Sequence, residues 1–334
     1  MILVVDKKET ILRYQTGCLL IEQPGIKKRR APLNQLEQVI VYGNPMAETA
    51  VWRALANAGV PAVMLSGRGK ENAAMLGSGL AIQLPLRRMQ HRCADHPGTS
   101  LAMAKWFVDR KLQSYDLPLA LHLGRSKTIV DDCKEFKVQR DLARVRVSQA
   151  TEVNALMGME GHVARAWFAL LAHHLPYKWK FAGRNRQPPR DPVNALLSLG
   201  YTLMHSELRQ AVIAGGLDPS LGFLHQVYPG RESLVLDFSE IFRSGVDTFV
   251  LGLIEDERLG ADGFYYREVD GCRLSKAVRP LFFKAWAQHR ENWLRPFAEP
   301  GGVGDWPAAP LREQAGGQVA LLREVMEAQG HTDG

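Results

Sequence analysis

The chain has 334 residues, of which 46% are hydrophobic and 23% are charged. Its length fits about two domains, and its composition is typical of a globular protein with a sizeable core, which excludes an intrinsically disordered chain. The formal net charge of +7 favours anionic partners such as nucleic acid, because a positive surface raises the local concentration of polyanions.

The cysteines and the apolar stretches indicate the compartment. Cys18, Cys93, Cys133 and Cys272 are scattered, so their spacing predicts neither a zinc knuckle nor a dense disulfide framework, and we expect reduced thiols. No apolar stretch reaches the roughly 18 residues that a membrane-spanning helix needs. We therefore expect a cytoplasmic protein that makes no contact with a membrane.

The first 85 residues have the pattern of a small sheet domain. One helix is predicted within it, capped by Asn44, with Pro45 in its first turn and Gly59 at its end. The basic run at residues 27–30 lies on a predicted strand or hairpin. A solvated sheet edge explains this run as well as DNA contact does, and we favour the edge. Short runs rich in β-branched residues, separated by turn signals, predict strands at MILVV, TILRYQ, CLLIEQ, LEQVIVYG, PAVMLS and AAML.

After residue 85 the strand pattern stops. Residues 86–98 are predicted to form a linker, and the residues from 99 onward have helical spacing. Helices are expected from residue 99 and over 136–147, 149–174, 191–214, 233–256, 275–295 and 311–328. The predicted fold class is therefore α+β, with an N-terminal β-rich domain (1–85), a linker (86–98) and a larger, nearly all-α domain (99–334).

One of the predicted helices carries a carboxylate among apolar positions. Glu160 shares a helical face with Leu156 and Val163. Burying a carboxylate is costly unless it is paired, protonated or bound to a metal ion. Glu160 is therefore a candidate metal ligand. The alternative is an ordinary ion pair at the edge of the apolar stripe, for example with Arg165.

A basic loop, residues 178–190, precedes the helix predicted at 191–214. It contains no acidic residue, and it leads into Asp191, a predicted helix cap, and Pro192 in the first turn. Arginine side chains, backbone N–H groups and the helix dipole all favour an anion at such a helix N-terminus. The alternative is a solvated charged loop. The residues that we predict to contact the DNA backbone are Arg184, Arg186 and Arg190.

Three more polar residues follow within a short stretch. His225 lies close to the turn at 229–230, and on its own a histidine is more often a hydrogen-bonded residue than a metal ligand. Asp237 and Glu240 are three positions apart on a helix that Ser233 is predicted to cap, so their carboxylates share a face and repel each other unless a cation lies between them. Carboxylates with one imidazole suit Mg²⁺ or Mn²⁺ better than Zn²⁺. Such an ion can orient a hydroxyl or a water molecule and offset charge on a phosphoryl group.

Three stretches together resemble the CRISPR-associated integrase-nuclease, the larger of the two proteins common to spacer-acquisition machinery. They are ALMGMEGHVARAWF, RQPPRDPVNALLSLGYTL and GLDPSLGFLHQVYPGRESLVLDFSEIFR. The resemblance covers almost the whole chain. It implies that Glu160, His225 and Glu240 are the catalytic metal ligands, and that Asp237 is a direct or a water-mediated ligand.

The resemblance also implies partners and a reaction. We expect a homodimer joined through its β-rich domains, with two such dimers around a dimer of the smaller acquisition subunit in a heterohexamer. This complex would insert a short protospacer duplex into the repeat array, when a 3′-hydroxyl attacks a phosphodiester without a covalent enzyme intermediate. Water in place of the hydroxyl would cut DNA. Two alternatives stay open: a DNA-binding scaffold without catalysis, and a metal-dependent phosphohydrolase of small substrates.

Overall fold

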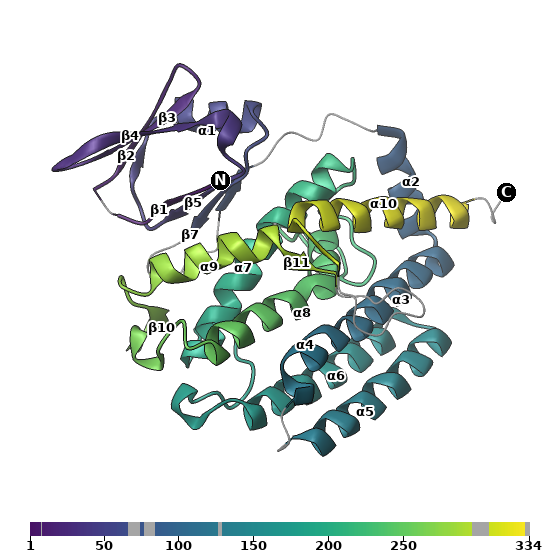
Figure 1. The fold of residues 1–334 in the computed structure, drawn as a ribbon. Helices are drawn as coiled ribbons and strands as arrows, with labels where there is room; N and C mark the ends of the chain where they lie inside the picture. Colours follow the sequence, from purple (N-terminus) through teal and green to yellow (C-terminus); the bar gives the residue numbers. More distant parts are fainter. Residues whose placement is uncertain (8, 66–73, 77–83, 126–128, 296–306, 331–334) are drawn as a thin grey trace. The chain divides into compact units, whose positions relative to one another are not determined.

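The computed structural model describes residues 1–7, 9–65, 74–76, 84–125, 129–295 and 307–330. Its internal contacts divide the chain into two compact units, Met1–Leu80 and Ala81–Gly334. Strands β1 to β8 belong to the first unit and helices α2 to α10 to the second (Figure 1). The predicted fold class, a β-rich part followed by a helical part, is confirmed.

Two four-stranded sheets build the first unit. One sheet has the order β1 (Ile2–Val5), β5 (Gln38–Tyr42), β7 (Ala62–Leu65) and β8 (Ala74–Leu76), with only the β7–β8 pair antiparallel. The other has the order β4 (Ile26–Pro32), β3 (Cys18–Gln23), β2 (Ile11–Gln15) and β6 (Met46–Ala47). One hydrophobic cluster contains side chains from both sheets and from helix α1 (Thr49–Asn57).

Two details of the first unit bear on the sequence predictions. The basic run lies on β4, an edge strand whose residues 26–30 are exposed, as the edge interpretation predicted. The predicted start of the helix at Asn44 and Pro45 is wrong, because α1 begins at Thr49. Backbone N–H groups of Met46 and Glu48 donate to carbonyls on and beside β2, so this backbone continues the sheet instead of starting a helix.

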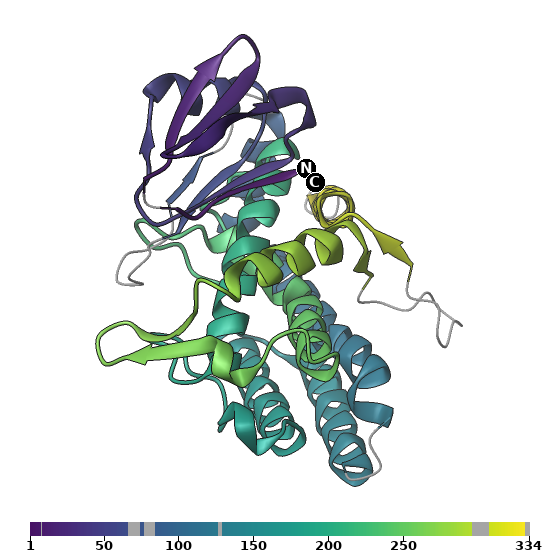
Figure 2. The same cartoon turned by 60° about the vertical axis from the view of Figure 1, so that its left-hand side comes forward.

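Helix α8 (Ser233–Glu255) is the central element of the second unit. It is buried along most of its length and packs against α3 (Pro97–Ser114) and α7 (Pro192–Ala214). Figures 1 and 2 show α3 side by side with α5 (Val130–Gln149) and α6 (Val153–His174). The described part of this unit also contains α2 (Leu84–Asp95), α4 (Asp116–Leu121), α9 (Arg279–Glu291) and α10 (Leu311–Gly330).

The segment 86–98, which the sequence predicted as a linker, is largely helical. Helix α2 spans Leu84–Asp95 and buries Leu86, Gln90 and Cys93 on one face. These positions have helical spacing, but only two of them are apolar, and the three arginines and one histidine between them hide the pattern. The linker prediction is therefore wrong for this segment.

A hairpin in the second unit was not predicted either. Strands β9 (Phe264–Arg267) and β10 (Gly271–Leu274) pair antiparallel, and the Cys272 backbone N–H donates to the Pro189 carbonyl at 2.7 Å. A Cβ atom built on Gly271 would lie 2.3 Å from the same oxygen, so only glycine allows this close approach. The hairpin therefore packs directly against the basic loop at Pro188 and Pro189. A second short pair joins β11 (Trp293–Leu294) to β12 (Ala308–Ala309).

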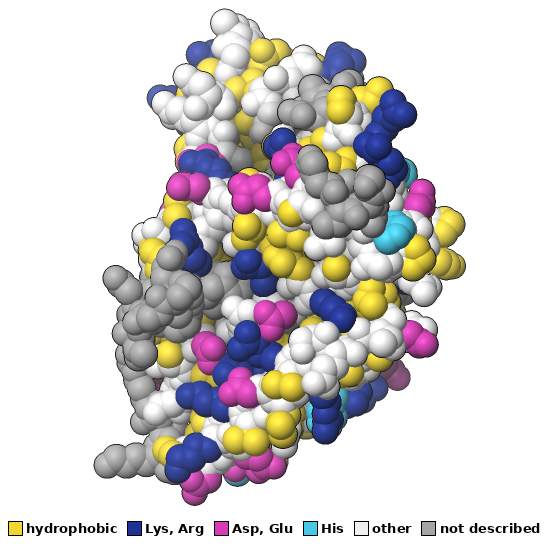
Figure 3. All heavy atoms as spheres, turned by 90° about the vertical axis from the view of Figure 1, so that its right-hand side faces the viewer, with side chains coloured by type: hydrophobic (Ala, Val, Ile, Leu, Met, Phe, Trp, Pro, Cys, Tyr) yellow, Lys and Arg dark blue, Asp and Glu magenta, His cyan; other side chains and the backbone are white. Residues whose placement is uncertain are grey.

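The surface charges, the cysteines and the polarity of the helices add three observations. On the face drawn in Figure 3, basic and acidic side chains are interspersed, so the net charge of +7 is not gathered into a single basic region there. Each of the four cysteines lies outside a disulfide in this structure. Within the described ranges, every helix is too short or too polar to cross a membrane.

Candidate active site

A buried lysine joins two of the predicted metal ligands. Lys111 on α3 donates hydrogen bonds to Oε1 of Glu160 on α6 and to Oε2 of Glu240 on α8. Only 4% of its side chain is exposed, so the ammonium has lost its water and depends on these two carboxylates. Two carboxylates from helices far apart in the sequence therefore converge on one cation.

Glu240 has a second cationic partner. Arg243, one turn further along α8, places its guanidinium NH2 nitrogen 2.9 Å from Oε1 of Glu240. Burial raises the pKa of Glu240, but Arg243 and Lys111 outweigh burial and lower this pKa to about 2. Glu240 is consequently ionised at neutral pH and carries the charge that a metal ion would need.

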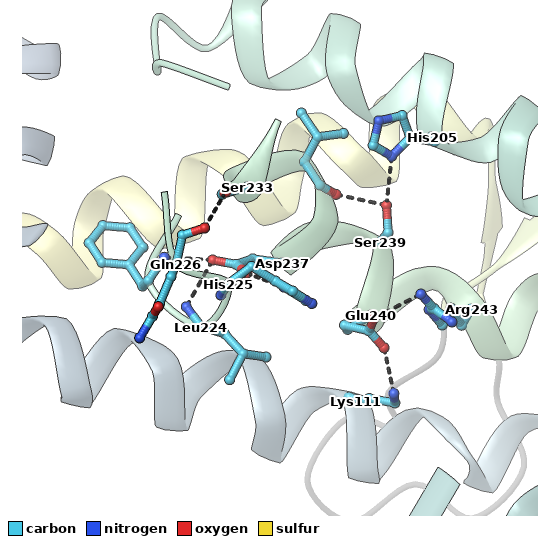
Figure 4. A network of polar contacts seen from close by, with 12 residues as sticks. Lys111, His205, Leu224, His225, Gln226, Ser233, Asp237, Ser239, Glu240 and Arg243 are labelled. Carbon is cyan, nitrogen blue, oxygen red and sulfur yellow. Dashed lines mark hydrogen bonds and ion pairs between the residues drawn. The ribbon is translucent and has the colours of Figure 1, made fainter. Parts of the chain in front are cut away.

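Asp237 lies one turn before Glu240 but is bound in another way (Figure 4). Its Oδ2 accepts from the backbone N–H groups of Phe223 at 2.6 Å and Leu224 at 3.1 Å, and its Oδ1 accepts from that of His225 at 2.9 Å. Burial raises the pKa of Asp237, while the hydrogen bonds from His225 and Phe223 act in the opposite direction. Both oxygens are thus occupied by the loop that carries the histidine.

The same carboxylate orients the imidazole of His225. Nδ1 of the ring lies 2.7 Å from Oδ1 of Asp237. Because an ionised carboxylate only accepts, Nδ1 carries the proton, and Nε2 of the neutral ring keeps a lone pair. Metal-binding histidines are commonly held in this way by a carboxylate on the second nitrogen. The side chain is 22% exposed, so the ring is not sealed inside the core.

The structure brings Glu160 and Glu240 together on Lys111. It places His225 near Glu240, since the electrostatic effect of His225 is among the causes that lower the pKa of Glu240. In the described part of the chain, no three His, Cys, Asp or Glu side chains gather closely enough to hold a metal ion. The ammonium of Lys111 takes the position between the carboxylates. Two carboxylates and an imidazole are a donor set that suits Mg²⁺ or Mn²⁺, so the chemistry of these residues fits such an ion, although in this structure Lys111 lies between the two carboxylates.

Two cations of this site were missed by the sequence interpretation. Lys111 follows Phe107 and Val108 at helical spacing and is buried on the same face of α3, so a lone cation in an apolar stripe was the available signal. Arg243 is three positions after Glu240, which places it on the same face of α8. The alternative ion pair of Glu160 with Arg165 does not form; Lys111 is the partner instead.

Helix α8 carries a third buried acid, Asp247, which follows Asp237 and Glu240 along the helix. It accepts hydrogen bonds from Trp167 Nε1 at 2.8 Å and from the hydroxyl of Tyr201. Burial raises the pKa of Asp247 to about 6, although both hydrogen bonds favour the charged form. The ring of Tyr201 has the guanidinium groups of Arg243 and Arg184 at 5.1 and 5.4 Å from its centroid. Tyr201 therefore connects the basic loop with α8.

The three arginines predicted to contact DNA differ in their surroundings. Arg186 and Arg190 are exposed. Arg184 is partly buried. Its guanidinium donates to Asn194 Oδ1 at 2.7 Å and to Ser198 Oγ at 3.1 Å, and burial lowers the pKa of Arg184. Arg184 thus fixes the shape of the basic loop, while the other two side chains reach solvent.

Of the two helix caps predicted in the second unit, one is confirmed. Asp191 caps α7, because its Oδ1 accepts from the backbone N–H of Asn194 at 2.8 Å. Ser233 is not the cap of α8 but its first residue. Its hydroxyl donates to the Gln226 carbonyl at 2.9 Å and so fixes the chain just after His225.

The sequence matches the family model described as CRISPR associated protein Cas1 over residues 3–288. The chain belongs to the Cas1 family. A Cas1 relative from Chlorobaculum tepidum, named CRISPR-associated endonuclease Cas1 1, is 32% identical over 296 residues, which cover 87% of this chain and 86% of the relative. The resemblance stated from the three sequence stretches is therefore confirmed.

Two solved structures share the fold of this Cas1 chain. A casposase bound to an integration product matches with a TM-score of 0.79 and 18% identity, covering 98% of this chain and 91% of the casposase. A chain of a Cas6-RT-Cas1–Cas2 complex matches with a TM-score of 0.80 and 21% identity, covering 98% of this chain and 35% of that one. At these identities the similarity is one of fold.

Proposed function

We propose that this Cas1 chain is a metal-dependent DNA integrase and endonuclease that inserts new spacers into a CRISPR repeat array. The observation that carries the proposal is the convergence of Glu160 and Glu240 on one buried cation beside an oriented His225. The named activity of the Chlorobaculum relative and the integration product in the casposase structure support it.

In this proposal Glu160, Glu240 and Nε2 of His225 hold Mg²⁺ or Mn²⁺. A bound ion of this kind orients the attacking hydroxyl or water and offsets charge that develops on the phosphoryl group. Asp237 acts through His225 and not as a direct ligand, because both of its oxygens already accept hydrogen bonds. Glu240 remains ionised at neutral pH because Arg243 and Lys111 counter the effect of burial on its pKa.

DNA is proposed to lie along the basic loop at the N-terminus of α7. Arg186 and Arg190 offer exposed charges there, and Arg184 holds the loop in shape and adds its own charge. Each phosphate contact contributes about one unit to the slope of log affinity against log salt concentration. The double variant Arg186→Ala and Arg190→Ala should therefore reduce the magnitude of this negative slope by about two, as measured by fluorescence anisotropy with a duplex. An unchanged slope would contradict this assignment.

The partners are proposed from the family. The β-rich first unit would join two copies of the chain, and two such dimers would flank a dimer of the smaller acquisition subunit. The fold similarity to a chain of a complex that contains Cas1 and Cas2 supports this assembly. Size-exclusion chromatography with light scattering, with and without the smaller subunit, measures it directly.

The experiment that tests the function uses a 3′-hydroxyl oligonucleotide and a supercoiled plasmid that carries the repeat. Wild-type protein with Mg²⁺ or Mn²⁺ and the smaller subunit should give integrated product, and the His225→Ala variant should not. DNA binding without product would favour the catalytically silent scaffold. Hydrolysis of nucleotides in the absence of DNA and of the smaller subunit would favour the small-substrate phosphohydrolase.

A further inference from the structure

Helix α2 reaches the turn that leads to His225 through one buried side chain. Gln90 has an exposed fraction of 0%. Its Nε2 donates to the carbonyls of Asp218 at 3.0 Å and Leu221 at 2.8 Å, and its Oε1 accepts from the backbone N–H of Asp218 at 2.8 Å. Both N–H donors of the amide and its oxygen are therefore used on a single turn, residues 218–221.

This turn is the start of a continuous segment, residues 218–226, which we call the histidine segment. Its beginning is attached to α8, because the Leu234 N–H donates to the Pro219 carbonyl at 3.0 Å. Its middle lies tightly against α8: a Cβ atom on Gly222 would come within 2.9 Å of Asp237 Oδ2. The whole segment is thus anchored to α8 on one side, and Gln90 is its contact with α2 on the other.

The chemistry of position 90 indicates that the amide serves the turn and not the packing of α2. The face of α2 that Gln90 shares with Leu86 and Cys93 is buried, and an apolar side chain would fill it without losing water from a polar group. A buried amide is tolerated only when its hydrogen bonds are made, and here every one of them goes to the histidine segment.

We propose that Gln90 is a positioning residue for His225. It fixes the first turn of the histidine segment, as Asp237 fixes residues 223–225, so that Nε2 of His225 stays directed to the metal position. This inference rests on the proposed function, because the role of His225 as a metal ligand is part of that proposal. Partners that orient a ligand typically contribute 10–100-fold to metal affinity.

The test compares Gln90→Met, which keeps the volume and removes the three hydrogen bonds, with Cys93→Ala on the same buried face of α2. Mn²⁺ affinity is measured by isothermal titration on the full chain, and hydrogen exchange is followed at the amides of residues 223–225. We expect Gln90→Met to bind Mn²⁺ about 10-fold more weakly and to exchange these amides faster. Cys93→Ala should match the wild type in both measurements. If Gln90→Met does not fold, Gln90→Asn, which withdraws the amide by one methylene, is used in its place.

The outcomes separate this inference from the function on which it rests. Equal Mn²⁺ affinity and equal exchange in Gln90→Met and wild type would overturn the positioning role. Equal losses in Gln90→Met and Cys93→Ala would also overturn it, because they would indicate a general loosening of α2. If wild-type protein bound no Mn²⁺, the metal-dependent function would fail, and the exchange of residues 223–225 would still decide whether Gln90 holds the segment.

Discussion

Helix α8 carries two carboxylates one turn apart that have opposite kinds of partner. Glu240 is bound by the side-chain cations Lys111 and Arg243, whereas Asp237 is bound by backbone N–H groups and by the ring of His225. A lysine on a flexible stem can move aside when another cation arrives, but a row of backbone amides cannot. The same functional group is therefore held by movable side chains at Glu240 and by fixed backbone groups one turn earlier, at Asp237.

The largest expected effect follows from removing the charge of Glu240. Glu240→Gln keeps the size of the side chain but not its charge, so strand transfer should fall by more than the roughly 100-fold that changes outside the ligand set reach. Integrated product is measured at saturating Mn²⁺. Glu255→Gln, near the end of α8 and paired with His122, is the matched control and should retain wild-type activity. Comparable activity in the two variants would remove Glu240 from the ligand set.

Loss of the Asp237 carboxylate should have a smaller effect on activity, and an effect of another kind. Asp237→Asn places an NH₂ group against donors, so at least one buried N–H group loses its acceptor, at a cost of about 1–3 kcal/mol in unfolding free energy. Mn²⁺ affinity should fall by about 10-fold, and excess Mn²⁺ should restore much of the strand transfer. Urea unfolding and a Mn²⁺ titration of activity measure both effects. A defect in strand transfer that excess Mn²⁺ does not restore would mean that Asp237 and Glu240 have equivalent roles.

A third variant tests whether Lys111 occupies the position of the ion. Lys111→Met leaves Glu160 and Glu240 without their shared cation, and breaking such a buried pair typically destabilises a protein by about 3–5 kcal/mol. Mn²⁺ should therefore raise the melting temperature of this variant more than that of the wild type, as measured by scanning calorimetry. An equal rise in both proteins would mean that lysine and metal do not compete for one position.

Asp247 extends the comparison to an acid that has neither role and should affect activity least. Burial raises its folded-state pKa to about 6, above the ordinary value of 3.8, so its contribution to stability is fully present below pH 3.8 and is lost as the pH rises through about 6. The amide of Asp247→Asn does not titrate. The unfolding free energy of the variant relative to wild type should therefore rise between about pH 4 and pH 6, by at most a few kcal/mol, and then stay level. A flat difference across this range would contradict the raised pKa.

The sequence predicted the acids of this site better than it predicted their partners. Glu160 and Glu240 stood out because a carboxylate in an apolar helical stripe is unusual, and periodicity shows which face of a helix is buried. It does not show which helix lies opposite. Lys111 meets Glu160 and Glu240 across 49 and 129 positions of sequence, so only the packed helices bring them together.

The same limit explains the error at α2 and the missed hairpin. Gln90 is a polar residue in a buried position, so it weakened the apolar pattern that would have indicated a helix over 86–95, and its partners at 218–221 lie far along the chain. Strands β9 and β10 are short, with a pattern that is only partly apolar. The residue types at helix starts predicted one cap of two in this unit. Asp191 was correctly predicted as a cap, whereas the Ser233 hydroxyl donates to the segment before it.

The contact between β10 and the basic loop has a consequence for how this protein can vary during evolution. Because a Cβ atom at Gly271 would meet the Pro189 carbonyl at 2.3 Å, a side chain at this position would push the loop out of place. The loop in turn holds the arginines that face solvent beside α7. Changes at 271 and at 188–189 are therefore expected to arise together in related sequences, so that the two segments diverge as one unit even though each looks like an independent surface turn.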